Sequence, residues 1–324
     1  MGNLFLTGAR LFTGSFESSI YLLGVIGGVD KNVEVVPAIN SNFSHHISAG
    51  LRDGSVITGQ NAISHPSTSP TVSDEEGGGD PETPITRHRS FQQEISDHDR
   101  VEDANLPGSL PMLRKQNISF AKTHTPDLPS PIERIWYINP YGQEILPSPN
   151  PKVLQAIGEA SCVVFSIGSL YTSIIPCLIL KGVGSALRDR GIKVKVLILN
   201  GSNDRETKDY TAKDFVRAIV EACHGENNET SVSGGDSIEI RAEKGVKEEE
   251  WKNYVTHIVH LQGEGTPRVE KEAFKAIGIE TLRIYGRKNE GGEGMIYDGV
   301  ALRQALEVVM GKGGEKGRRM SLER

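Results

Sequence analysis

The sequence has little cysteine and no long apolar run, and each absence excludes a class of protein. It contains 3 cysteines in 324 residues, at uneven spacing, which is typical of buried, reduced thiols and not of a disulfide framework or a zinc site. No apolar run reaches transmembrane length, and the N-terminus has no charged region followed by a signal core. We therefore expect a cytoplasmic protein with no membrane partner.

An excess of positive charge is also absent. The chain has 36 Lys and Arg against 42 Asp and Glu, a formal net charge of -6, so electrostatics favours neither nucleic acid nor an anionic membrane as partner. It has no CxxC pair, HExxH motif or Ser/His/Asp spacing. The adjacent His45 and His46 would point to opposite faces of a strand, so we predict no metal site and assign no catalytic residue.

The stretch from Ala160 to Pro176 organises the rest of the chain. Cys162 to Ile167 has the length and β-branched character of a strand buried on both faces. A hydroxyl-rich loop follows, and Pro176 suits the first turn of a helix. Strand, polar loop and helix together form a common anion site, although this loop has neither a Walker lysine nor GxGxxG spacing. From the residues alone, two interpretations of this loop stay open: a phosphate-facing loop and an ordinary strand-to-helix turn.

Composition divides the chain into four parts. Residues 1–65 and 132–310 have the apolar periodicity of ordered structure, and residues 311–324 form a polar tail. Residues 66–131 are polar and rich in Pro, Gly and charge, so we predict a long disordered insert. Residues near the far end of this insert that could dock on the fold are Leu110, Met112, Leu113, Ile118 and Phe120.

Two buried β-runs separated by a helix predict a βαβ unit, and therefore a parallel sheet. The expected strands are Glu34 to Ile39, Ile47 to Leu51, Ser55 to Ile57, Ile135 to Ile138, Glu144 to Ile145, Cys162 to Ile167, Val194 to Leu199, Tyr254 to Leu261 and Thr281 to Tyr285. The expected helices are Asn3 to Phe12, Phe16 to Leu23, Lys152 to Glu159, one ending at Asp189, Ala212 to Cys223, Arg268 to Ile277 and Val300 to Met310.

Several motifs, in the same order, resemble the CofD/YvcK family, which includes 2-phospho-L-lactate transferases and bacterial gluconeogenesis factors. The segment GSLYTSIIP from Gly168 to Pro176 is similar to the family's GSLYTS-[IV]-IP. Gly2-Asn3-Leu4 is similar to its GNL helix, and the segment from Asp53 to Gly59 to its DGT-V-x-G hairpin. Asn200, Glu206-Thr207 and the segment from Tyr210 to Asp214 resemble its N-…-ET-x-x-YT element. The segment from Trp136 to Gly142 and the polar insert are similar to fungal-type members.

The resemblance implies a Rossmann-like, mostly parallel sheet flanked by helices, interrupted by the disordered insert. It also implies a GDP- or UDP-linked ligand across the strand ends and, in the transferases, Mg²⁺. The sequence departs from the family in one respect: it starts at the GNL helix, without the family's first strand and GG-[GT]-[TA]-G phosphate loop. We therefore expect a truncated chain that has lost half of a nucleotide site. Its open sheet edge would favour aggregation or a homodimer.

The implied site would combine the loop after the central strand with the loop after the next one. The candidate substrate- or nucleotide-binding residues are Gly168, Ser169, Tyr171, Thr172, Ser173, Asn200, Glu206, Thr207 and Asn3. Each also has a structural interpretation, as a turn, a cap or a solvated polar group. Three functions stay open: a transferase that moves a phospholactyl-type group from a GDP-linked donor to a hydroxyl, a non-catalytic UDP-sugar-binding regulator, and an inactive fragment.

Overall fold

The computed structural model describes residues 2–41, 43, 45–65, 108–110, 113, 127–189, 191–225, 245–290 and 294–311. The predicted disordered insert and tail lie mostly outside these residues. Two residues near the far end of the insert are docked: the amide of Leu110 donates to the Pro140 carbonyl at 2.9 Å, and Leu113 is buried. No helix in the described part of the chain has both the length and the apolar character needed to cross a lipid bilayer.

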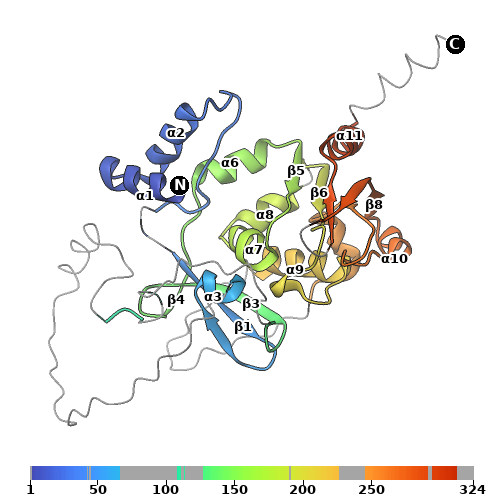
Figure 1. Cartoon of the computed structure of the whole chain (residues 1–324), viewed down its shortest axis with the longest axis horizontal. Coiled ribbons are helices and arrows are strands. Elements are labelled where there is room, and N and C mark those ends of the chain that lie inside the picture. The colour runs from blue at the N-terminus through green and yellow to red at the C-terminus, as the bar shows by residue number, and fades with distance from the viewer. Residues whose placement is uncertain are drawn as a thin grey trace.

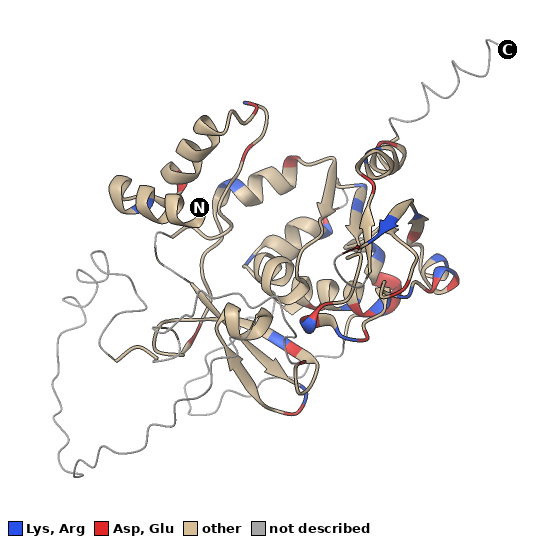
Figure 2. Ribbon diagram, in the orientation of Figure 1, with Lys and Arg blue, Asp and Glu red and all other residues tan. Residues whose placement is uncertain are grey.

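The chain begins with two adjoining helices, α1 (Gly2–Thr13) and α2 (Phe16–Ile26). The Ser15 side chain caps α2 by accepting a hydrogen bond from the amide of Ser18 at 3.2 Å, as the sequence predicts. Both helices carry few charges and lie at the end of the molecule that holds the N-terminus (Figures 1 and 2).

A four-stranded antiparallel sheet follows, in the order β2-β1-β3-β4. Its strands are β1 (His46–Leu51), β2 (Val56–Thr58), β3 (Ile132–Ile138) and β4 (Glu144–Ile145), and α3 (Gln60–Ser64) follows β2. The predicted Asp53-Gly54 turn joins β1 to β2, with Gly54 at φ +85°, a conformation that favours glycine. The Tyr137 hydroxyl donates to the Pro176 carbonyl at 2.9 Å and so ties this sheet to the next layer.

The second sheet has four parallel strands in the order β5-β6-β7-β8, which confirms the predicted parallel arrangement. The strands are β5 (Cys162–Phe165), β6 (Val194–Ile198), β7 (His257–His260) and β8 (Glu280–Arg283). Helix α6 (Pro151–Glu159) leads into β5, and its predicted cap is present: the Asn150 side chain accepts from the Lys152 amide at 3.0 Å. The connections carry η2 (Leu170–Ile174), α7 (Ile175–Leu178), α8 (Val183–Arg188), η3 (Arg205–Thr207), α9 (Ala212–Gly225), η4 (Glu248–Asn253) and α10 (Lys271–Ala276).

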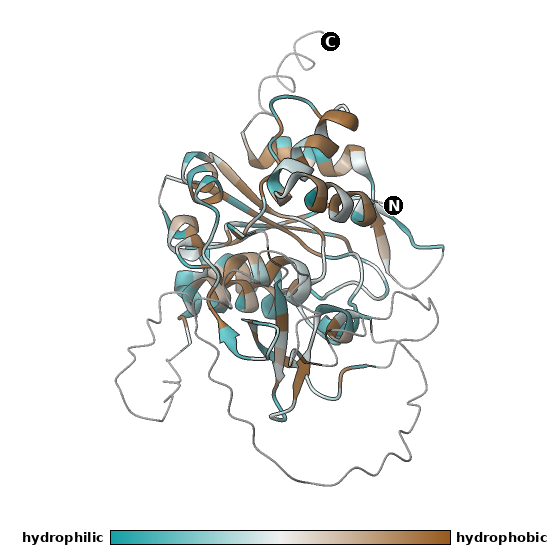
Figure 3. Cartoon of the chain, turned by 90° about the vertical axis from the view of Figure 1, so that its left-hand side faces the viewer, coloured by the Kyte–Doolittle hydropathy of each residue, from teal (hydrophilic) through white to brown (hydrophobic). Residues whose placement is uncertain are grey.

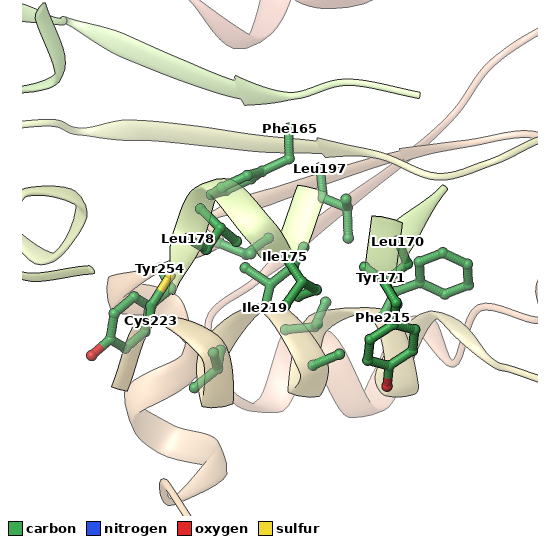
Figure 4. Close-up of a cluster of buried hydrophobic side chains, with 14 of the residues drawn as sticks. Phe165, Leu170, Tyr171, Ile175, Leu178, Leu197, Phe215, Ile219, Cys223 and Tyr254 are labelled. Atoms are coloured by element: carbon green, nitrogen blue, oxygen red, sulfur yellow. The ribbon is translucent and has the colours of Figure 1, made fainter. Parts of the chain in front are cut away.

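Helices cover both faces of the parallel sheet, so the expected α/β fold is confirmed. On one face, Phe165 and Leu197 point from the strands toward Ile175 of α7 and Ile219 of α9 (Figure 4). On the other face, Val196, Ile198 and Val259 pack on α11 (Gly299–Val309) through Ala305. The apolar strands lie between the helical layers in Figure 3. Burial on two faces explains the mostly apolar sequence of β6 and the buried Ile258 and Val259 at the centre of β7.

Three local expectations are wrong. The segment from Glu34 to Ile39 is not a strand; Ile39 forms only an isolated bridge with Pro149. β5 lies at a sheet edge with Val164 40% exposed, so it is not buried on both faces. Cys177 is exposed on α7, whereas Cys223 is buried as expected.

One hairpin was not predicted. The strands β9 (Gly286–Lys288) and β10 (Met295–Tyr297) pair antiparallel beyond β8. Each strand is only three residues long, and the sequence between them, residues 289–294, is rich in Gly and charge, so the hairpin carries little alternation of apolar and polar residues.

Candidate functional site

A cavity of about 560 Å³ lies where the loops after β5, β6 and β7 meet the end of α3. In parallel α/β sheets, ligands bind at the carboxyl ends of the strands, which is where these loops begin. A volume of this size falls within the usual range for small-molecule sites. The residues that line the cavity are Ser64, His65, Asp127, Ser169, Asn203, Asp204, Arg205, Glu206, Lys208, Asp209 and Gly265.

The loop after β5 presents backbone amides. Ser169 precedes the single π-helical turn η2, and its carbonyl accepts from the amides of Ser173 and Ile174 at 2.9 and 3.3 Å. The amides of Ser169 and Leu170 meet no hydrogen-bond acceptor among the described residues. The first amides of a helix have no partner within that helix and can bind a carboxylate or a phosphate that reaches them. Of these two residues, Ser169 lines the cavity and Leu170 is fully buried.

The next two amides of the same turn already have an acceptor, the carboxylate of Glu206. Its Oε2 accepts from the amides of Tyr171 and Thr172 at 2.8 and 3.2 Å, and its Oε1 accepts from Thr172 Oγ1 at 2.6 Å. Glu206 is 2% exposed, and this burial raises the pKa of its carboxyl group, against the opposing effect of the Thr172 and Tyr171 hydrogen bonds. Glu206 therefore acts as a built-in hydrogen-bond acceptor at the helix start.

A capping box holds Glu206 in place. Asp204 Oδ1 accepts from the amides of Glu206 and Thr207 at 3.0 and 3.1 Å, and from Thr207 Oγ1 at 2.8 Å. The Asp204 amide in turn donates to Thr207 Oγ1 at 3.1 Å. Thr207 is fully buried, so its role in the structure is to fix the short 3₁₀ turn that carries Glu206.

The two strand-end loops are joined at further points. The Asn200 side-chain amide donates to the Gly168 carbonyl at 3.1 Å. The Tyr171 hydroxyl shares a 3.0 Å hydrogen bond with that of Tyr210 and donates to the Ile132 carbonyl at 3.3 Å. Burial raises the pKa of Tyr171, so the phenol stays protonated and serves as a packing and hydrogen-bonding group.

The structure thus separates the predicted site residues into groups. Ser169 and Glu206 line the cavity. Behind the cavity wall, hydrogen bonds within and between the two loops hold Gly168, Tyr171, Thr172, Asn200 and Thr207. Ser173 is exposed on η2, and Asn3 is exposed in α1 and does not line the cavity. Contact between any of these residues and a ligand stays a prediction.

Most charged residues of the cavity were not among the predicted ones. Arg205 donates to the carbonyls of Ala62 and Ile63 and joins η3 to α3; Lys208 pairs with Asp127 on the surface. Arg205 and Lys208 stand in the same loop as Glu206, and that proximity was a usable signal. Ser64, His65 and Asp127 come from distant parts of the chain, and only the fold brings them to this place.

The residues of the site do not form a protein-held metal centre. No group of three or more His, Cys, Asp or Glu side chains within the described residues could hold an ion. Both carboxylate oxygens of Glu206 accept hydrogen bonds, and Asp204 Oδ1 caps η3. Asp209, at the cavity, makes no hydrogen bond with the described residues. A single carboxylate matches Mg²⁺ only where the ligand supplies phosphate oxygens as well.

Comparison with known proteins agrees with the fold. A family model described as "2-phospho-L-lactate transferase CofD" matches residues 1–283. The uncharacterized protein YNL011C of Saccharomyces cerevisiae is 36% identical over 303 residues, which cover 88% of this chain and 64% of that protein. The gluconeogenesis factor of Halalkalibacterium halodurans is 30% identical over 136 residues, covering 41% of this chain and 37% of the relative.

The chain therefore spans less than two thirds of the length of these curated relatives. A crystal structure of a UPF0052-family protein from Bacillus halodurans superposes with a TM-score of 0.56 at 20% identity, covering 94% of this chain and 71% of that one. At this level of identity, the likeness shows that the two chains share a fold.

Proposed function

This chain belongs to the CofD family, and we propose that its cavity binds a nucleotide-linked, phosphate-containing small molecule. In this proposal a phospholactyl-type group passes from a GDP-linked donor to the hydroxyl of an acceptor: the hydroxyl oxygen bonds to the phosphorus of that group and gives up its proton, the P–O–P bond of the donor breaks, and GMP leaves. The observation that carries the binding proposal is the backbone amide of Ser169, which meets no acceptor among the described residues and belongs to a residue of the cavity wall.

Five cavity residues have defined parts in this proposal. The amide and hydroxyl of Ser169 donate to phosphate oxygens, and the side chains of Arg205 and Lys208 add positive charge on the opposite loop. Mg²⁺, when bound, would neutralise charge on the diphosphate, with Asp209 as the carboxylate available to it. Glu206 keeps the loop rigid, so that these donors are oriented before a ligand arrives.

A non-catalytic regulator that binds a UDP-sugar is the second candidate. Two observations favour it: several curated relatives bear the name gluconeogenesis factor, and both oxygens of the buried Glu206 are already hydrogen-bonded. A carboxylate occupied in this way is a poor general base, because catalysis requires it to reach an acceptor hydroxyl. Binding with no turnover would identify this function.

The proposal is tested by titrating the chain with GDP and with UDP-N-acetylglucosamine, each with and without Mg²⁺, by calorimetry. Ser169→Ala should weaken the binding of the preferred nucleotide about tenfold, because it removes a hydrogen bond to a charged group. The matched control is Ser161→Ala, an exposed serine at the opposite end of β5, which should bind as the parent chain does. Equal affinity in both variants would exclude the Ser169 hydroxyl from the site.

Turnover then separates the two candidates. The chain is incubated with a donor in which lactate is linked to GDP and with a hydroxyl acceptor, and released GMP is measured, because transfer of the phospholactyl group leaves one phosphate on the nucleoside. GMP release that depends on the acceptor supports the transferase. Saturable nucleotide binding without GMP release supports the regulator, and binding of neither nucleotide would overturn the proposal.

A further inference from the structure

Four glycines gather where the β9–β10 hairpin meets the ends of β6 and β7. Each stands where an added Cβ atom would lie within 3 Å of a neighbouring atom, a distance that real side chains do not tolerate. They come from the loops after β6 and β7 and from the hairpin itself: Gly201, Gly263, Gly286 and Gly294. Gly201, Gly286 and Gly294 approach backbone atoms this closely, and Gly263 approaches the Met295 side chain, because none of the four carries a side chain of its own.

Gly201 makes the tightest of these contacts. An added Cβ would lie 1.8 Å from the carbonyl oxygen of Met295 in β10. Gly201 has no left-handed backbone conformation, so an alanine there would meet no strain from φ. The contact with the hairpin backbone is therefore what requires glycine at this position.

Hydrogen bonds fix the same contact. The Met295 amide donates to the Gly201 carbonyl at 2.8 Å. The Tyr297 hydroxyl donates to the carbonyl of Leu199, the residue after β6, at 2.6 Å. The hairpin is thus held to the loop after β6 by its backbone and by a phenol.

The same loop continues directly into the cavity wall. Asn203 and Glu206 follow Gly201 closely, and the Asn203 amide donates to the carbonyl of Gly265 on the other side of the cavity at 3.3 Å. We infer that Gly201 is a positioning residue: its contact with the β9–β10 hairpin sets the place of the loop that presents Arg205 and Glu206. The effect on ligand affinity rests on the nucleotide site proposed above.

The test substitutes alanine for Gly201. Relieving the contact with the Met295 carbonyl requires a shift of about 1 Å, and displacements of that size can lower the efficiency of a site many-fold. Gly201→Ala should therefore weaken the affinity for the preferred nucleotide about tenfold or more, and should speed amide hydrogen exchange from Asn203 to Thr207. The matched control is Gly158→Ala in α6, where an added Cβ meets nothing within 4 Å.

A rescue experiment separates the contact from a general loss of stability. An added Cβ at Gly263 would meet the Met295 side chain at 2.7 Å, so removing that side chain should relieve it. Met295→Ala should therefore return the rate of hydrogen exchange and the nucleotide affinity of Gly263→Ala to those of the parent chain. It should not restore them in Gly201→Ala, whose conflict is with the Met295 backbone.

The outcomes distinguish this inference from the proposed function. If the parent chain binds no nucleotide, the proposed function fails, and hydrogen exchange alone decides the inference. If Gly201→Ala lowers the melting temperature but leaves both exchange in the loop and affinity as in Gly158→Ala, Gly201 is not a positioning residue. Faster exchange in the loop that Met295→Ala does not reverse supports the inference.

Discussion

The loops after β5 and β6 leave the same edge of the parallel sheet, yet they have opposite hydrogen-bonding roles. The first is a donor loop, with amides from Ser169 to Thr172 at a helix start. The second is an acceptor loop, which inserts the buried carboxylate of Glu206 between those donors. The helix start is therefore only partly open: Glu206 accepts from the amides of Tyr171 and Thr172, Leu170 is buried, and Ser169 lines the cavity.

This difference shows how the chain builds a rigid helix start at the proposed site. A helix start that is open to water must desolvate and reorganise when it binds phosphate. Here the Glu206 carboxylate fixes the conformation of the helix start through hydrogen bonds within the protein. The capping box of Asp204 and Thr207 fixes the position of Glu206. The arrangement makes the two loops one cooperative unit, which mutations can break at defined points.

Glu206→Ala should have the largest effect on stability. It leaves two buried amides and the Thr172 hydroxyl without their acceptor, and we expect a loss of about 3 kcal/mol in the free energy of unfolding. Urea denaturation measures the change. The matched control is Glu264→Ala, which removes an exposed carboxylate and should cost less than about 0.5 kcal/mol. Equal losses in the two variants would mean that Glu206 does not hold the donor loop.

Asp204→Ala should have an intermediate effect. It removes the cap of the 3₁₀ turn but leaves Glu206 present, so a loss of about 1–2 kcal/mol is expected. Asp204→Asn retains a side-chain oxygen acceptor and should recover most of the stability in the same denaturation experiment. If both variants lose the same amount, the charge of Asp204 matters more than its cap geometry.

The smallest effect on stability should be the change in its pH dependence when Glu206 is replaced by Gln. Burial raises the pKa of Glu206 in the folded state, so the folded chain holds this proton more tightly than the unfolded chain does. The contribution of this group to stability is therefore greatest below its ordinary pKa of 4.5 and falls as the pH rises through the raised folded-state pKa. Glu206→Gln removes this titration, so unfolding measured across that pH range should lose less stability with rising pH than the parent chain. A steeper fall in the variant would contradict the sign.

Much of the fold could be predicted locally. The Asp53-Gly54 turn, the Ser15 cap and the Asn150-Pro151 start of α6 depend on neighbours in the chain, and all were predicted. The parallel pairing of β5 with β6 followed from two apolar runs around a helical segment. The segment from Glu34 to Ile39 failed because alternating residues form a strand only where a partner strand is present.

The sequence by itself determined the α/β fold, the family, and which loops carry polar residues at the strand ends. Only the tertiary structure decided how those polar groups are used. Glu206 is one carboxylate in a polar loop until the fold brings it to the amides of Tyr171 and Thr172. Likewise, position 201 requires glycine because the β9–β10 hairpin packs against it, and only the fold brings the two together. Hydrogen bonds and steric contacts between distant segments depend on where the backbone places them, and no local pattern encodes that placement.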